Sequence, residues 1–177
     1  TTNFAAGIPY WAISVARFVD GRPSEVFLDV PALRQRIVAL KGRGAFRNGE
    51  ALTAETRLLA NSACVSLCSR SIRVLQRKPD QPFPGKIRLL GVASLNLVSV
   101  AMGQTLGALE ATPRIWDLAA AWLVLEELDC PIRWLGTDPS LLKPGQDLSQ
   151  APFPMLAAGS VAQLNRLLPW AEALSEG

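Results

Sequence analysis

The sequence predicts a mixed protein, α+β or α/β, in which an antiparallel sheet is followed by an α/β layer. Residues 10–40 alternate with a period of two between turn-forming residues, which is typical of antiparallel strands. The hydrophobic period changes near residue 51. Beyond it, short apolar runs alternate with segments of helical spacing, which is typical of an α/β layer. We therefore expect two domains: residues 1–55 form the end of an antiparallel-sheet domain, and residues 56–177 form an α/β domain.

The first expected strand covers residues 10–19. Ile13 and Val15 lie on one face of it, and Ala16 and Phe18 lie on the other. Because both faces are largely apolar, we expect this strand to be covered on both sides. A turn at residues 20–23 and strands at residues 25–30 and 36–40 complete the expected sheet.

A glycine-rich turn follows at residues 41–49, and its Asn48-Gly49 pair is typical of a tight turn with positive φ. The glycines also permit a phosphate cradle. No Gly-Lys-Ser/Thr sequence follows them and no helix is expected to begin there, so a structural hairpin is favoured.

In the α/β part, residues 58–61 predict a short buried strand and residues 66–76 predict a helix. Arg70, Arg73 and Arg77 are expected on the solvated side of that helix. Ser160 is a plausible N-cap for the last helix. The other expected elements are strands at 87–90, 105–110, 132–135 and 153–158, and helices at 93–102, 115–128 and 161–174.

The helix at residues 115–128 is expected to pack deeply, because its apolar residues follow helical spacing. Asp117 lies in its first turn, where the helix dipole stabilises a carboxylate without any function. Position alone therefore favours a structural cap. The tryptophans are expected in the core or in interfaces: Trp11, Trp116, Trp122, Trp134 and Trp170.

The composition excludes several classes of protein. Of 177 residues, 49% are hydrophobic, which is enough for a packed core and excludes a largely disordered chain. The 18 basic and 15 acidic residues give a net charge of only +3 without a long basic run, so neither a nucleic-acid nor a membrane partner is expected. No apolar segment is long enough to span a bilayer, and the start has no signal-peptide pattern.

The cysteines indicate a reducing compartment, so we expect a cytoplasmic protein. Cys64, Cys68 and Cys130 form an odd set, and the chain has no histidine. Cys64 and Cys68 could hold a metal on one helix, but two further ligands are missing. Packing roles are therefore favoured, and a zinc site is not expected.

Four segments resemble the inositol monophosphatase family. Residues 116–121 resemble its signature Trp-Asp-x-Ala-Ala-Gly, with Ala121 in place of the final Gly. Residues 1–4 resemble the end of Asp-Pro-x-Asp-Gly-Thr-Thr-Asn-Phe, and residues 88–94 resemble Arg-x-x-Gly-Ser/Thr-Ala-Ala. Residues 42–49 resemble Gly-x-Gly-Ala-Phe-x-Asn-Gly almost letter for letter.

The resemblance implies a layered αβαβα sandwich of the inositol monophosphatase and fructose-1,6-bisphosphatase type, with its N-terminal part missing and its active site between the two sheets. It also implies a Mg²⁺-dependent, lithium-sensitive phosphomonoesterase. Such an enzyme hydrolyses inositol monophosphate or a related sugar phosphate through metal-activated water. A homodimer is expected from the same resemblance.

Two catalytic residues are implied. Asp117 would bind Mg²⁺, and Thr1 would help to position the phosphate and the attacking water. The Glu and two Asp residues that complete the metal site in the family precede the Thr-Thr pair, and so lie outside this chain. We therefore expect these residues alone to bind metal weakly and to be inactive.

The implied substrate-binding residues follow two strands. Gly91, Val92 and Ala93 would offer backbone N–H groups at a helix N-terminus, and Glu110 would accept hydrogen bonds from substrate hydroxyls. Without the resemblance, the glycine is an ordinary strand-to-helix turn, and Glu110 is as readily an exposed carboxylate at a strand end.

Other functions stay open. Ala121, and Leu128-Asp129-Cys130 in place of the family's Ala-Gly-Gly, indicate a diverged branch. A catalytically inactive fragment or interaction module that keeps the fold is therefore an alternative. An N-terminal-nucleophile hydrolase is a third hypothesis, because an initial Thr1 can act as nucleophile and base together. Such enzymes resembling proteasome subunits also need an early lysine, and the first here is Lys41.

Overall fold

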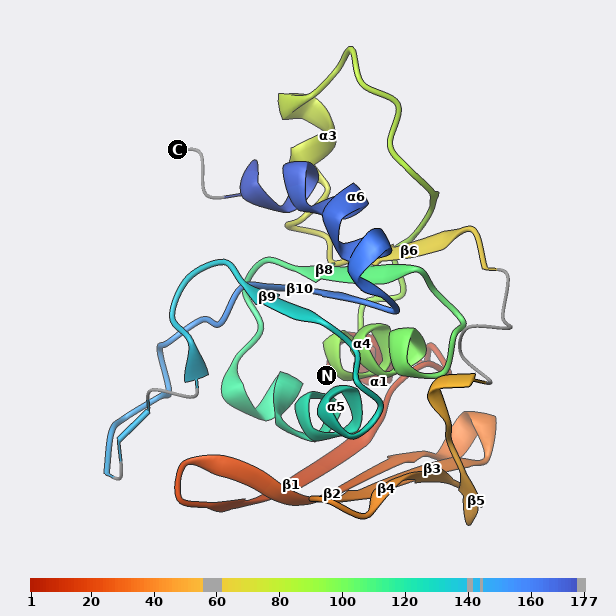
Figure 1. The fold of residues 1–177 in the computed structure, drawn as a ribbon, viewed down its shortest axis with the longest axis vertical. Coiled ribbons are helices and arrows are strands. Elements are labelled where there is room, and N and C mark those ends of the chain that lie inside the picture. Colours follow the sequence, from red (N-terminus) through yellow and green to blue (C-terminus); the bar gives the residue numbers. More distant parts are fainter. Residues whose placement is uncertain (56–61, 140–141, 144, 175–177) are drawn as a thin grey trace.

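A computed structural model describes residues 1–55, 62–139, 142–143 and 145–174. The first third of the chain forms an antiparallel sheet, sheet A, with the strand order β1-β2-β3-β4-β5 (Figure 1). A short helix, α1 (Thr2–Ala5), precedes it, and a 3-10 turn (Pro31–Leu33) joins β2 to β3. The strands are β1 (Ile13–Val19), β2 (Arg22–Val30), β3 (Gln35–Leu40), β4 (Gly44–Arg47) and β5 (Glu50–Ala51).

The expectation of a first strand covered on both sides is wrong. Strand β1 begins at Ile13 and is an edge strand, and the side chains of Ile13 and Val15 are 50% and 55% exposed. Alternation shows which residues share a face. It does not show whether another layer lies against that face.

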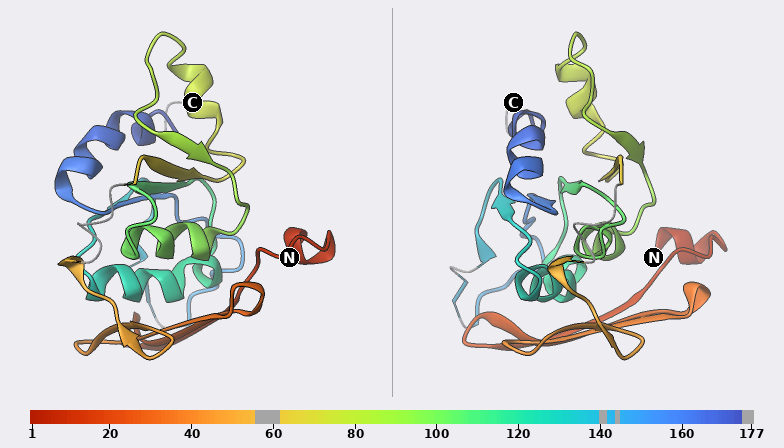
Figure 2. Two further views of the ribbon diagram at one scale, coloured as in Figure 1. Left: turned by 90° about the vertical axis from the view of Figure 1, so that its right-hand side faces the viewer. Right: turned by 45° about the vertical axis from the view of Figure 1, so that its right-hand side comes forward.

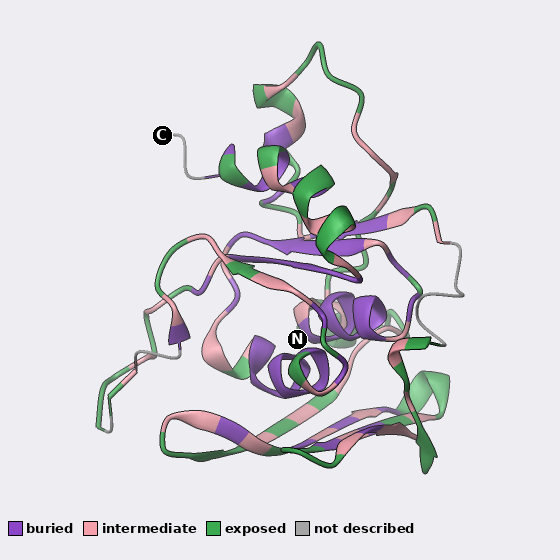
Figure 3. Ribbon diagram, in the orientation of Figure 1, coloured by how far each residue is buried: buried purple, intermediate pink, exposed green. Residues whose placement is uncertain are grey.

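The outer face of sheet A carries one apolar row that crosses all five strands. The register places these residues opposite one another in order: Val15, Phe27, Val38, Phe46 and Ala51. Ion pairs flank the row, with Arg17 2.9 Å from Glu25 and Arg36 3.4 Å from Asp29. Within the described part of the chain, no helix packs on this face (Figures 1 and 3).

Sheet B is mixed and has the strand order β7-β6-β8-β10-β9. Strand β6 is parallel to both β7 and β8, whereas β10 is antiparallel to β8 and β9. The strands are β6 (Cys64–Leu67), β7 (Lys86–Arg88), β8 (Gly107–Glu110), β9 (Ile132–Trp134) and β10 (Met155–Ala158).

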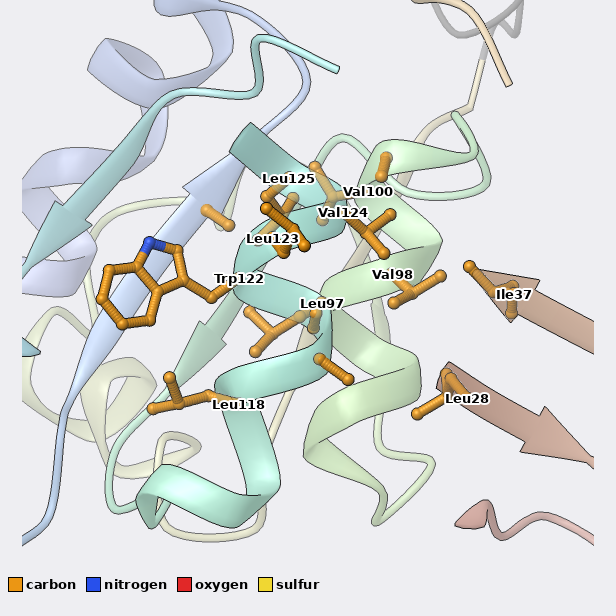
Figure 4. Packing of buried hydrophobic residues seen from close by; sticks show 14 of the residues in the cluster. Leu28, Ile37, Leu97, Val98, Val100, Leu118, Trp122, Leu123, Val124 and Leu125 are labelled. Atoms are coloured by element: carbon orange, nitrogen blue, oxygen red, sulfur yellow. The ribbon is translucent and has the colours of Figure 1, made fainter. Parts of the chain in front are cut away.

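Two helices, α4 (Ala93–Ala101) and α5 (Ile115–Glu127), lie side by side between the sheets (Figures 1 and 2). Nearly every residue of α4 is buried, and so are eight consecutive residues of α5, from Leu118 to Leu125. The predicted deep packing of this helix is therefore confirmed. Leu28 and Ile37 of sheet A point toward these helices (Figure 4), and one hydrophobic cluster joins all three layers.

The outer helical layer covers the other face of sheet B. Helix α6 (Val161–Glu172) packs its Leu167 and Trp170 against this face, beside the short helix α3 (Arg73–Arg77). The predicted N-cap is confirmed, because Ser160 Oγ accepts a hydrogen bond from the Gln163 N–H at 3.3 Å. The layers run sheet A, α4 and α5, sheet B, α6 and α3, which are four of the five layers of the expected αβαβα sandwich.

The expected helix at residues 66–76 is confirmed only in its last turn, and its start is wrong. Its first residues belong to β6, and only Arg73–Arg77 are helical. Arg70, Arg73 and Arg77 are all exposed, as expected. Two of them also hydrogen-bond to carbonyls at the end of α6: Arg73 donates to the Leu174 carbonyl at 3.3 Å and Arg77 to the Ala173 carbonyl. These cations satisfy carbonyls at the end of a helix, where the helix dipole favours positive charge.

Among the tryptophans, Trp122 and Trp170 are buried as expected, whereas Trp116 is 54% exposed. The expected strand at residues 58–61 lies outside the described residues. Division into domains 1–55 and 56–177 stays a prediction. The three cysteines are free thiols.

Candidate functional site

A pocket of about 230 Å³ lies at the edge of sheet B where β6 and β8 end. From β6 the chain passes through α3 to β7 on one side, and from β7 through α4 to β8 on the other. Ligands of open α/β sheets commonly bind where the chain direction switches in this way. The lining residues are Cys68, Ser69, Arg70, Gly91, Val92, Ala93, Asn96, Glu110, Thr112, Pro113 and Asp117.

The N-terminus of α4 opens onto this pocket. Gly91 turns the chain with a φ of 76°, and Val92 is the N-cap residue, so no side chain caps the helix. The first N–H groups of a helix have no partner within the helix, and together with its dipole they favour an anion. The structure thus brings the predicted residues Gly91, Val92 and Ala93 to the pocket with backbone donors available.

The start of the chain is attached to this turn by Asn3. Its Nδ2 donates to the Tyr10 carbonyl and to the Leu90 carbonyl, both at 2.8 Å. A Cβ added to Gly91 would lie 3.2 Å from Asn3 Oδ1. Thr1 is the exposed N-cap residue of α1 and is not among the residues that line the pocket. A catalytic role for Thr1 therefore stays a prediction.

Glu110 ends β8 inside the protein and is only 2% exposed, so the alternative of an exposed strand-end carboxylate is wrong. Its Oε1 accepts a hydrogen bond from Asn96 Nδ2 at 2.8 Å. Burial raises the pKa of the Glu110 carboxyl from its ordinary 4.5 to about 7, against the lowering effect of the Asn96 hydrogen bond. Glu110 can therefore donate or accept a hydrogen bond near neutral pH.

Asp117 lies in the first turn of α5, and one of its oxygens is used as a cap. Its Oδ2 accepts the Arg114 N–H at 2.9 Å, while the Asp117 N–H donates to the Arg114 carbonyl at 3.0 Å. The structural role suggested by position alone is thus present. Asp117 also lies near enough to Glu110 to help raise the pKa of that carboxyl.

The glycine-rich hairpin at residues 41–49 binds a carboxylate of the protein itself where a phosphate cradle would bind a phosphate. The Gly42 and Gly44 N–H groups donate to the two carboxylate oxygens of Glu127, both at 2.7 Å. Glu127 ends α5 and so joins this helix to sheet A. Its role was not predicted, because the partner residues are more than 80 positions apart in the sequence.

Asp117 and Glu110 are the two carboxylates of the pocket. Carboxylate oxygens suit Mg²⁺, but that ion needs more ligands than one carboxylate. Across the residues that the structure describes, no group of three or more His, Cys, Asp or Glu side chains could hold a metal ion. The described chain thus supplies part of an oxygen ligand set and not a whole one.

The matches with known proteins agree with this arrangement. The sequence profile of the inositol monophosphatase family matches residues 1–154. The chain belongs to the inositol monophosphatase family. The N-terminal-nucleophile hypothesis is therefore set aside in favour of a phosphatase family.

Two relatives show the range of this family. A histidinol-phosphatase of Mycobacterium tuberculosis is 32% identical over 139 residues, which are 72% of this chain and 52% of that protein. A fructose-1,6-bisphosphatase/inositol-1-monophosphatase of Thermotoga maritima is 28% identical over 133 residues, which are 72% of this chain and 50% of that protein. The chain spans about half the length of these curated relatives.

The expected fold is confirmed by solved structures. An IMPase of Thermotoga maritima superposes with a TM-score of 0.75 at 22% identity, covering 99% of this chain and 66% of that structure. This likeness concerns the fold alone. None of the helices in the described ranges has the length and apolar composition needed to cross a membrane.

Proposed function

We propose that this chain forms the substrate-binding part of a Mg²⁺-dependent phosphomonoesterase that hydrolyses inositol monophosphate or a related sugar phosphate. One observation carries the proposal: the open N-terminus of α4, the buried Glu110 and the helix-capping Asp117 meet in one pocket. Metal-dependent hydrolysis of a phosphorylated polyol requires three kinds of group. These are donors for the phosphate oxygens, an acceptor for the hydroxyls and a ligand for the cation.

Each residue has a separate task in this reaction. The N–H groups at Gly91, Val92 and Ala93 hold oxygens of the substrate, and Glu110 accepts hydrogen bonds from its hydroxyls. Asp117 contributes one ligand to Mg²⁺, with its other oxygen fixed by the Arg114 N–H. When bound, the metal supplies an activated water and neutralises charge on the phosphoryl oxygens.

Thr1 is proposed to position the phosphate and the attacking water. Asn3 supports this role, because it ties the first residues of the chain to the turn that opens α4. We further propose a cytoplasmic homodimer that has no nucleic-acid or membrane partner. The mild charge supports the absence of such partners, and the free thiols support the location, whereas the homodimer rests on the family resemblance alone.

The test is Mg²⁺-dependent phosphate release from inositol monophosphate, with the intact mass measured on the same sample. We expect release by a protein heavier than 19.1 kDa, and a fall in kcat of at least about 100-fold in Asp117→Asn, because a metal ligand is lost. Asp147→Asn, at an exposed loop position, is the matched control and should keep full activity. Equal kcat in the two variants would contradict the assignment of Asp117.

A second candidate is a catalytically inactive fragment or interaction module with the family fold. The lack of a complete metal-ligand group among the described residues favours it. A sample of 19.1 kDa that releases no phosphate at high Mg²⁺ would support this candidate against the first.

A further inference from the structure

Cys68 directly follows β6, and its partly exposed side chain lines the pocket. The Ala111 N–H donates to Cys68 Sγ at 3.4 Å. The Ser71 N–H donates to the same sulfur at 3.3 Å and also to the Cys68 carbonyl at 3.0 Å. N–H groups stabilise the negative charge that a sulfur carries when it acts as a nucleophile. These donors therefore favour Cys68 as a nucleophile at the wall of the pocket.

Two groups can accept the proton of this thiol. Ser71 Oγ lies 3.0 Å from Cys68 Sγ, and its own proton is donated to the Leu109 carbonyl at 2.8 Å. The second acceptor is the carboxyl of Glu110, to which the Cys68 side chain also hydrogen-bonds. A carboxylate beside a thiol can take its proton as the sulfur attacks, as the adjacent base of an activated nucleophile does.

The other two thiols lack these surroundings. Cys130 is only 6% exposed, and its sulfur lies 3.9 Å from the Leu128 carbonyl. Cys64 is partly exposed like Cys68, but it does not line the pocket, and among the described residues no N–H donates to its sulfur. Cys64 is therefore a matched reference that differs from Cys68 in its hydrogen bonds and its place.

Asn96 independently points to a ligand beside Cys68. It lines the pocket although it is only 1% exposed, and its Nδ2 donates to Glu110. Asn96 Oδ1 is buried and accepts no hydrogen bond from any described residue. Buried oxygens of this kind are normally paired. A ligand that brings an N–H group into the pocket would supply the missing donor.

The charges of the pocket narrow the class of ligand. The open N–H groups of α4 favour an anionic group such as a carboxylate. Glu110 and Asp117 line the same pocket and favour hydrogen-bond donors. A short peptide carries both carboxylates and N–H groups, and so it matches both sides of the pocket.

We propose that Cys68 is a modification site that forms a mixed disulfide with a small peptide thiol. The Cys68 sulfur attacks one sulfur of the peptide disulfide, so that a bond from Cys68 to the peptide forms and the original S–S bond breaks. The second peptide leaves as a thiolate with the electron pair, and the Cys68 proton passes to Glu110. The Cys68 sulfur is thereby oxidised and the departing sulfur reduced.

The attached peptide covers the N-terminus of α4 and excludes a phosphate from the pocket. This consequence rests on the proposed function, because it requires that the unmodified pocket bind phosphate. The formation of the mixed disulfide does not depend on that function.

The test is incubation of the full chain with glutathione disulfide, followed by intact mass over time and by peptide mapping. We expect one glutathionyl group on Cys68, formed at least about tenfold faster than at Cys64 or Cys130, because only Cys68 combines access with N–H donors to sulfur. Cys68→Ser should lose the fast reaction, and Cys64→Ser should keep it. A rate at Cys64 that equals or exceeds the rate at Cys68 would overturn the proposal.

Hydroxyethyl disulfide is the matched control reagent, since it undergoes the same exchange but has neither N–H groups nor carboxylates. Its rate at Cys68 should exceed its rate at Cys64 by a smaller factor than for glutathione disulfide. An equal factor for the two reagents would overturn the assignment of a peptide ligand.

Titration with inorganic phosphate, followed by NMR, tests the closure of the pocket. Glutathionylated protein should bind phosphate at least about tenfold more weakly than unmodified protein. Cys68→Ser should keep its phosphate affinity after the same treatment. Unchanged phosphate binding by protein modified at Cys68 would overturn the closure. If the unmodified protein binds no phosphate, the proposed function is contradicted instead, and the rates at the three thiols still decide whether Cys68 is the modification site.

Discussion

Two glycine-containing turns of this protein present backbone N–H groups in the same way, and only one of them is open to a ligand. In the hairpin between β3 and β4, the Gly42 and Gly44 N–H groups bind the Glu127 carboxylate. At the turn before α4, the N–H groups after Gly91 face a pocket, and no side chain caps them. The difference between the structural turn and the candidate binding site is therefore whether a carboxylate from another element already occupies the N–H groups.

The carboxylates near the two turns differ in a complementary way. Glu127 accepts hydrogen bonds from two backbone N–H groups, whereas Glu110 is buried and has only side-chain donors, from Asn96 and Cys68. Burial with little compensation explains the raised pKa of Glu110. The β3–β4 hairpin, closed by Glu127, is thus expected to raise the free energy of unfolding. The open turn before α4 and the buried Glu110 beside it are expected to lower that free energy, while leaving room for a ligand.

The largest expected effect concerns Glu110 and pH. The folded state keeps the Glu110 proton up to pH of about 7, whereas the unfolded state loses it near 4.5. Stability from this group is therefore full at low pH and falls as pH rises through that window, by about 3 kcal/mol at most. The free energy of unfolding in urea, measured across this range, should show the fall in the wild type and much less of it in Glu110→Gln.

Glu172→Gln, at an exposed position of α6, is the control and should keep the wild-type slope. Parallel pH profiles for the wild type and Glu110→Gln would show that the pKa of Glu110 is not raised in the folded protein. That result would mean that Glu110 and Glu127 do not differ in the way described above.

The next effect tests the closed turn. Glu127→Gln should lower the free energy of unfolding by about 2 kcal/mol, because two N–H groups lose a charged acceptor. Sugar-phosphate binding should survive wherever the variant is folded. Urea unfolding with Glu172→Gln as reference measures the loss, and a change below the error of the method would mean that solvent satisfies these N–H groups equally well.

The smallest expected effect on stability distinguishes Gly42 of the β3–β4 hairpin from Gly91 of the turn before α4. Gly42 and Gly91 both have positive φ, but a Cβ on Gly42 meets nothing within 4 Å, whereas one on Gly91 approaches Asn3. Gly42→Ala should cost about 1 kcal/mol, from backbone strain alone. Gly91→Ala should cost somewhat more and should also weaken sugar-phosphate binding. Equal stability and binding in the two variants would mean that the Asn3 contact has no influence on the pocket.

Much of the fold was predictable because it depends on local patterns. The helices α4, α5 and α6 and the strands β2 and β3 lie within a few residues of their expected positions. Helical spacing and the Ser160 cap specify them without information from distant residues. The family motifs also correctly indicated that Gly91, Glu110 and Asp117 lie close together, although their roles remain proposals.

The errors concern features that distant residues decide. Exposure of β1 depends on what lies against sheet A, and apolar alternation does not contain that information. The helix expected at residues 66–76 begins only at Arg73, because residues 66 and 67 pair with β7 and β8 and so belong to strand β6. The arginines of this segment bind α6 and the pocket through contacts that no spacing in the sequence reveals.

Helix α5 connects the pocket with the β3–β4 hairpin. Asp117, in the first helical turn, lines the pocket, and Glu127, at the end of the helix, binds the hairpin. Its thirteen residues form a stiff rod of about 20 Å. A protein engineer who transplants the pocket would therefore have to carry over the distant β3–β4 hairpin as well. Conversely, residues on the wall of the pocket that lie outside α5 can be exchanged while the rod and its anchor stay untouched.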